Sequence, residues 1–137
     1  MDPASALADL TEISSQIESA VILDAAGAVL ASTFPDEARG ERLARAAGAL
    51  VEAAAEVRGG TGESLTQLEA ATREGSVFVV VEESRRIAAT TGPGPTVGLV
   101  FYDLKSCLRQ LDEEEPKPKP RARAKPKPRA KKADDAP

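Results

Sequence analysis

The sequence predicts one α+β domain, in the order helix, strand, strand, long helix, three strands and helix, followed by a basic C-terminal arm. Apolar residues recur every three or four positions in three segments and form short continuous or alternating runs between those segments. From Asp112 onward the chain contains no large apolar residue, so this part cannot bury a core. We therefore expect a domain at residues 1–111 and a disordered tail at residues 112–137.

The first segments predict a helix and a hairpin. A helix is expected at Ala4–Glu18, where four apolar residues share one face: Leu7, Leu10, Ile13 and Ile17. The continuous apolar run Ala20–Leu23 is typical of a strand that is covered on both faces. A second strand is expected at Val29–Thr33. Asp24 and Gly27 stand between the two runs in the pattern of a tight turn, which indicates a hairpin.

The long helix is expected to begin around Pro35-Asp36-Glu37, to continue to Val57, and to stop at Gly59-Gly60. A helical wheel shows two apolar surfaces. The wide surface, expected to lie on the sheet, consists of Leu43, Ala46, Ala47, Leu50, Ala54 and Val57. The narrow stripe of mostly small residues consists of Ala44, Gly48, Val51 and Ala55. Small residues let helices approach closely, so the stripe predicts a second helix packed there; the alternative is that alanine serves only helix propensity.

The second half predicts three strands and a closing helix. The strands are expected at Ser64–Thr72, Ser76–Glu82 and Arg86–Thr91, because turn residues separate these β-prone runs. The middle strand is apolar throughout its centre and should be internal, whereas the first alternates imperfectly, as an edge or interface strand does. After the break at Thr91–Pro95, helical spacing of apolar residues continues to Leu111. A strand at Thr96–Tyr102 is the competing interpretation of the first half of that segment.

The residue types exclude most catalytic chemistry. The chain has no histidine and one cysteine, Cys107, which excludes Ser-His-Asp catalysis, imidazole zinc sites and an internal disulfide. Arg58–Gly62 is glycine-rich, but it lacks the Lys-Ser/Thr end and the strand-before-helix context of a phosphate loop. We expect no enzyme activity, no cofactor, no metal site and no small-molecule substrate. The acidic start without a long apolar run predicts no signal peptide and a cytoplasmic protein.

Two segments resemble a known family. The expected hairpin Ala20–Leu30, the closing segment Val97–Leu111 and the order of elements together resemble the Roadblock family of dynein light-chain type. The resemblance implies a five-stranded antiparallel sheet with the long helix on one face and the two terminal helices on the other. It also implies dimers in which the long helices lie side by side and the third strands pair. The dimer interface would then include Ala44, Gly48, Val51, Ala55, Leu65 and Leu68.

The resemblance also implies a function. Family members are regulators and adaptors, and bacterial ones are similar to the activator of the gliding-motility GTPase. This chain lacks the GxxxxGK[ST] phosphate loop, so any GTPase must be a separate polypeptide. We therefore expect a non-enzymatic, homodimeric scaffold or regulator of a small Ras-like GTPase.

The arm has a composition of its own. Residues 1–111 hold sixteen acidic and nine basic side chains, whereas the arm concentrates nine cations in one short stretch. These cations are Lys117, Lys119, Arg121, Arg123, Lys125, Lys127, Arg129, Lys131 and Lys132. Alternating prolines and cations favour an extended chain. Three uses stay open: binding nucleic-acid phosphates, binding an anionic membrane, or solubilising the protein while touching its own acidic domain. The alternative function is a nucleic-acid-associated protein in which the domain dimerises this tail.

Overall fold

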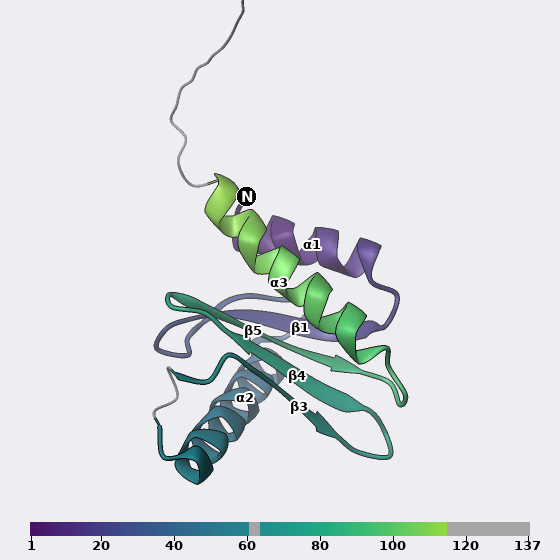
Figure 1. The fold of residues 1–137 in the computed structure, drawn as a ribbon. Coiled ribbons are helices and arrows are strands. Elements are labelled where there is room, and N and C mark those ends of the chain that lie inside the picture. The colour runs from purple at the N-terminus through teal and green to yellow at the C-terminus, as the bar shows by residue number, and fades with distance from the viewer. Residues whose placement is uncertain (61–63, 115–137) are drawn as a thin grey trace, which may run out of the picture.

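The computed structural model describes residues 1–60 and 64–114 and confirms the predicted element order (Figure 1). The predicted tail lies outside the described residues from position 115 onward. The elements are α1 (Pro3–Ile13), β1 (Ile17–Asp24), β2 (Val29–Ser32), α2 (Glu37–Arg58), β3 (Gln67–Ala71), β4 (Ser76–Val81), β5 (Arg85–Thr91) and α3 (Val97–Glu114).

Five antiparallel strands form one sheet in the order β2-β1-β5-β4-β3. Helix α2 covers one face, and α1 and α3 pack together on the other, as the family resemblance implies (Figure 1). The two faces bury separate apolar layers. Phe78 anchors the α1–α3 layer, where its ring meets that of Phe101 edge-on with the centroids 5.0 Å apart. On the other face Val21, Val79 and Val51 belong to the layer beneath α2.

Local signals fix the ends of α2 and the first turn. The Asp36 side chain caps α2 by accepting a hydrogen bond from the Arg39 N–H at 3.1 Å. Gly59 ends the helix at a φ of 77°, a left-handed conformation that favours glycine. In the β1–β2 turn, Asp24 Oδ1 accepts hydrogen bonds from the N–H groups of Ala26 and Ala28, both at 2.9 Å. The predicted turn role of Asp24 is confirmed.

Helix α1 is shorter than predicted. It ends at Ile13, because Ser14 takes an extended conformation while its N–H still bonds the Leu10 carbonyl. Ile17, predicted on the apolar face of this helix, instead begins β1 and pairs with Thr91 of β5. Ile13 is left 68% exposed. The helical spacing of Ile17 is therefore coincidental, and its burial comes from the strand.

The remaining differences lie at element ends. Strand β3 begins at Gln67 rather than Ser64, β4 ends one residue early at Val81, and β5 begins one residue early at Arg85. Helix α3 continues to Glu114, three residues beyond the expected end of the domain. The competing strand at residues 96–102 is wrong, because that segment belongs to α3. The buried residues of α3 recur along one face of the helix: Val100, Leu104, Cys107, Leu108 and Leu111.

Candidate partner-binding surfaces

The predicted orientation of α2 is wrong. Three residues of the narrow stripe, Ala44, Val51 and Ala55, are 8%, 0% and 6% exposed, and Ala44 and Val51 belong to the layer between α2 and the chain's own sheet. From the wide surface, Ala46 is exposed and Val57 is 83% exposed. The face that contacts the sheet is therefore centred between the two predicted surfaces.

Close contact between α2 and the sheet explains this orientation. Gly40 is buried, and a Cβ atom there would lie 2.8 Å from the Ser32 Oγ atom of β2. Small side chains on this side of α2, such as Ala44 and Ala47, thus permit a close helix–sheet approach. Glycine and alanine permit close packing against a helix or against a sheet, so the sequence pattern fits either partner. Gly40, which is buried beside Ser32 of β2, marks the side of α2 that faces the sheet.

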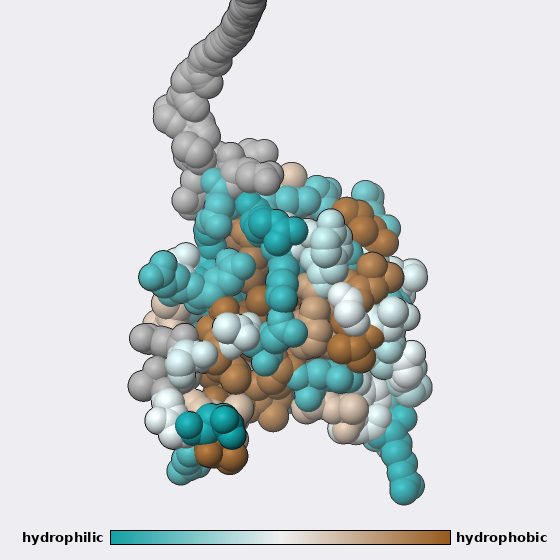
Figure 2. All heavy atoms as spheres, viewed as in Figure 1, coloured by the Kyte–Doolittle hydropathy of each residue, from teal (hydrophilic) through white to brown (hydrophobic). Residues whose placement is uncertain are grey.

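The outward side of α2 carries an apolar strip with no cover in the described part of the chain. We call it the outer face of α2, and it consists of Ala46, Ala49, Leu50, Ala53 and Val57. Leu50 is half-buried, and the other four are exposed. Valine and leucine at such positions add apolar area that water contacts in an isolated protomer. Apolar surface is visible beside α2 and β3 in the space-filling view (Figure 2).

Strand β3 is an edge of the sheet. Within the described residues it pairs only with β4, so the N–H and C=O groups along its outer side have no strand partner. An open edge is a template for pairing with another chain. Leu65 and Leu68 are half-buried against the layer beneath α2. The prediction of an edge strand here is confirmed.

The positions predicted for the interface thus divide into two groups. Ala44, Val51 and Ala55 lie inside the protomer, whereas Gly48, Leu65 and Leu68 are partly accessible. A Cβ atom at Gly48 would meet no heavy atom within 4 Å, so this position is open. The predicted tail cations, Lys117 to Lys132, lie outside the described residues.

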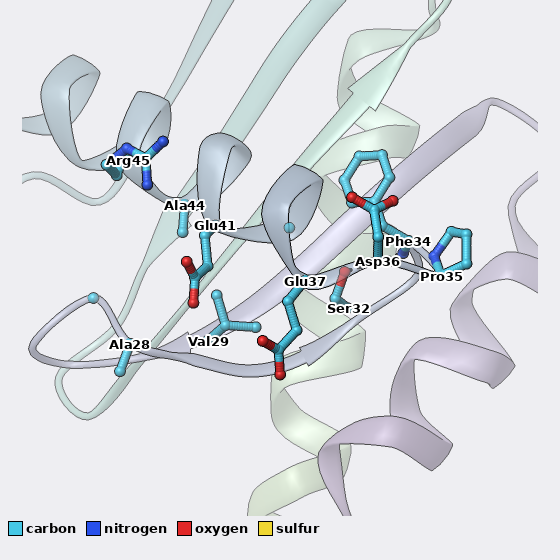
Figure 3. Close-up of a pocket in the computed structure, with 12 residues that line it drawn as sticks. Ala28, Val29, Ser32, Phe34, Pro35, Asp36, Glu37, Glu41, Ala44 and Arg45 are labelled. Atoms are coloured by element: carbon cyan, nitrogen blue, oxygen red, sulfur yellow. Dashed lines mark hydrogen bonds between the residues drawn. The ribbon is translucent and has the colours of Figure 1, made fainter.

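A groove of about 480 Å³ lies at the other end of the sheet, between α2 and β2 (Figure 3). Val29, Phe34 and Ala44 contribute its apolar lining, and Glu37 and Glu41 extend over it from the first turns of α2.

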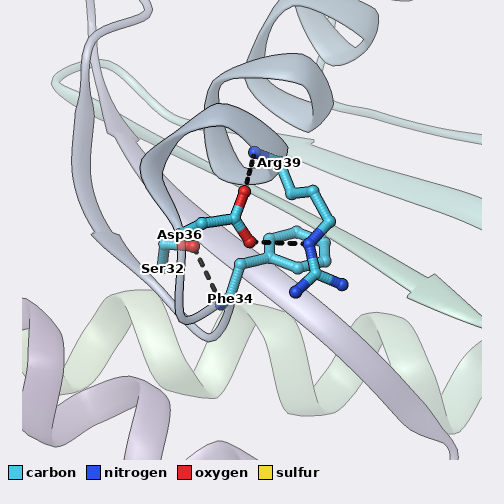
Figure 4. Close-up of polar contacts among 4 residues, drawn as sticks. All are labelled: Ser32, Phe34, Asp36 and Arg39. Carbon is cyan, nitrogen blue, oxygen red and sulfur yellow. Dashed lines mark hydrogen bonds and ion pairs between the residues drawn. The ribbon is translucent and has the colours of Figure 1, made fainter.

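A compact polar cluster fixes one wall of this groove (Figure 4). Arg39 Nε donates to Asp36 Oδ1 at 2.7 Å, and the guanidinium lies 5.3 Å from the centroid of the Phe34 ring. The Phe34 N–H donates to Ser32 Oγ at 3.0 Å. The hydrogen bonds from Arg39 lower the pKa of Asp36, so its carboxylate stays charged and bound to Arg39.

The described residues offer no catalytic constellation. They contain no cluster of three or more residues suited to holding a metal ion. Burial raises the pKa of the Cys107 thiol to about 12, with a smaller contribution from the charge of Asp9, so the reactive thiolate is disfavoured. No described helix is long and apolar enough to cross a membrane.

Comparison with known proteins agrees with the fold. The model of the Roadblock/LC7 domain family matches residues 5–90, from α1 to the penultimate residue of β5. The chain belongs to the Roadblock/LC7 family. No protein of curated function matches the sequence closely enough to count as a relative.

Solved Roadblock/LC7 structures share this architecture at low sequence identity. A Roadblock/LC7 domain from Streptomyces avermitilis aligns with a TM-score of 0.70 and 19% identity, covering 82% of this chain and 97% of its own. MglB of Myxococcus xanthus aligns with a TM-score of 0.63 and 16% identity, covering 86% and 92%. An MglB with a tetrameric arrangement gives a TM-score of 0.58 and 19% identity, covering 81% and 88%. At these identities the likeness shows the shared fold.

Proposed function

We propose that this Roadblock/LC7 protein is a homodimeric, non-enzymatic regulator of a small Ras-like GTPase supplied by a separate chain. Family membership and the likeness to MglB, a bacterial GTPase regulator of this fold, support the regulatory role. The likeness to an MglB with a tetrameric arrangement supports self-association. The GTPase must be separate because the sequence contains no GxxxxGK[ST] loop to hold the nucleotide phosphates.

The uncovered outer face of α2 is the observation that carries the proposal. An α-helix of 22 residues is about 33 Å long, and one face about 10 Å wide offers roughly 330 Å². A stable interface buries about 800 Å² on each partner. The helix face alone is therefore too small, and the open β3 edge would have to contribute the rest. In the proposed dimer α2 contacts its counterpart while β3 continues the sheet into the second copy.

This dimer uses a revised set of residues. Ala46, Leu50, Ala53 and Val57 would make the helix contact, and Leu65 and Leu68 would lie beside the paired edges. Ala44, Val51 and Ala55 would support α2 from inside the protomer. Gly48 stays in the proposed interface at its margin, since it is half-buried with open space around it.

A charge-insertion pair tests the dimer. The double substitution Ala53→Glu with Val57→Glu places two carboxylates on the outer face, where burial in an interface would be unfavourable. Both side chains are exposed in the protomer, so the fold should survive. The matched control is Leu99→Glu with Tyr102→Glu, at exposed positions of α3 on the opposite side of the sheet. Light scattering should show folded monomers for the first variant and dimers for the control. A first variant that dimerises as tightly as the native chain would contradict the proposal.

The regulatory role needs its own assay. Small Ras-like GTPases of the source organism are purified, and their GTP hydrolysis and nucleotide release are measured with and without the protein. A change in either rate that requires the intact dimer is the expected result. If no such GTPase binds the protein or changes its rates while the dimer itself is confirmed, the GTPase role is wrong and the dimer stands.

A further inference from the structure

The groove between α2 and β2 is built to hold an extended segment. One wall is α2, the opposite wall is the edge strand β2, and the floor is apolar (Figure 3). Charged groups line it unevenly. Asp36, Glu37 and Glu41 contribute three carboxylates, whereas Arg45 is the one basic side chain in the lining. Asp36 is already bound to Arg39, so Glu37 and Glu41 are the carboxylates open to a cationic ligand.

The chain's own arm has complementary chemistry. From Pro116 to Lys131 every odd position is Lys or Arg, and every even position is Pro or Ala. In a β-extended chain successive side chains point to opposite sides, so an arm bound in this conformation places its cations on one side and its prolines and alanines on the other. Proline has no N–H group, so the prolines of the arm can contact an apolar floor without leaving a donor of their own unsatisfied.

The spacing of charges also agrees. Alternate residues of a β-extended chain are about 6.6 Å apart, at about 3.3 Å per residue. Glu37 and Glu41 are four helical positions apart, which is a rise of about 6 Å. Two consecutive cations of the arm therefore match the two open carboxylates in register.

The arm leaves the domain close enough to reach the groove. Asp112, in the last described turns of α3, forms an ion pair with Arg85 at the start of β5. Arg85 pairs with Asp24 across β5 and β1. Asp24 begins the turn that contains Gly27 and Ala28, and these two residues line the groove. Each layer of the fold is about 10 Å thick, so the path to the α2 side is about 20 Å. The fifteen positions from Asp112 to Lys127 span about 45 Å when extended.

We propose that the basic arm, residues 117–131, binds in the α2–β2 groove of its own chain, with its cations on Glu37 and Glu41. Each exposed ion pair is weak, but tethering gives the arm an effective concentration on the order of millimolar. The groove thus acts as an internal competitor that holds the cations away from external polyanions, and raised salt releases the arm. This inference is independent of the GTPase role.

Paramagnetic relaxation in the full-length chain tests the contact. A nitroxide is attached through Ala130→Cys, and Cys107, which is 2% exposed, stays unlabelled in the folded protein. Amide signals of Ala28, Val29 and Ala44 are expected to lose more than half of their intensity at about 0.01 M salt, where the Debye length is about 30 Å. They should recover at about 1 M salt, where it is about 3 Å.

A charge-matched pair of variants locates the contact. Glu37→Gln with Glu41→Gln should restore the groove signals at low salt. Glu52→Gln with Glu56→Gln makes the same charge change at the same spacing on the same helix and should leave the broadening intact. The proposal is overturned if no groove signal broadens, if both double variants restore the signals equally, or if the broadening is as strong between labelled and unlabelled copies mixed in one sample.

Discussion

Replacing Val51 by alanine tests the orientation of α2 most directly. Val51 is 0% exposed and packs in the layer between α2 and the sheet. Two buried methyl groups are lost, at about 0.8 kcal/mol each, and the residual cavity adds up to about 1 kcal/mol. The higher helix propensity of alanine returns about 0.5 kcal/mol. The free energy of unfolding should therefore fall by about 2 kcal/mol, which corresponds to a drop in melting temperature of about 10 °C for a domain of this size.

The same chemical change at Val57 is the control. Val57 is 83% exposed in the protomer, so Val57→Ala should change the free energy of unfolding by less than about 0.5 kcal/mol. Urea unfolding at low protein concentration measures both variants, because dilution removes any contribution from self-association. The orientation predicted from the sequence requires the opposite ranking. If Val57→Ala is as destabilising as Val51→Ala in the dilute protomer, the reasoning about this helix is refuted.

Other outcomes follow from single sites. Gly59→Ala forces a side chain into a left-handed conformation and should destabilise the protein by about 1 kcal/mol, whereas Gly48→Ala, at an open helical position, should stabilise it by a similar amount; thermal unfolding compares them. Because the folded-state pKa of Asp36 is lowered by Arg39, its contribution to stability is present above its ordinary pKa of 3.8 and is lost as the pH falls below it; the melting temperatures of the native chain and Asp36→Asn should converge in acid. Burial raises the pKa of the Cys107 thiol from 9.0 to about 12. The contribution of this group to folding stability is therefore fully present below pH 9.0 and is lost as the pH rises toward 12. At pH 8 a thiol reagent should modify it slowly in the folded chain and rapidly in urea.

The architecture was predictable because local signals and burial agree along most of the chain. Val77–Val81 is apolar at every position and forms the inner strand β4, which is covered on both faces. Asp24 and Gly27 determine the first turn through hydrogen bonds within five residues. Such features depend on neighbours in sequence, and reasoning from sequence captures them. The end of α1 was less predictable, because Ile17 fits a helical period and a strand equally well.

The orientation of α2 was not predictable by the same means. Fourteen of its 22 residues are alanine, glycine, leucine or valine at positions that face in several directions, so periodicity alone leaves the sheet side undetermined. The choice depends on the contact between Gly40 and Ser32, which are brought together only by the fold. The predicted interface depends on the same choice, because the stripe that predicts a partner helix is defined relative to the side of α2 that contacts the sheet.

The two proposed contacts use opposite edges of the sheet, and this separation makes them independent. The order β2-β1-β5-β4-β3 places three strands between β2 and β3, a distance of about 19 Å at about 4.8 Å per strand. A dimer that pairs β3 with its counterpart therefore leaves the α2–β2 groove open in both copies. Glu37→Gln with Glu41→Gln should release the arm without dissociating the dimer, and Ala53→Glu with Val57→Glu should dissociate the dimer without releasing the arm. If either pair of substitutions disrupts both contacts, the arm and the interface share a surface and the separation inferred from the strand order is wrong.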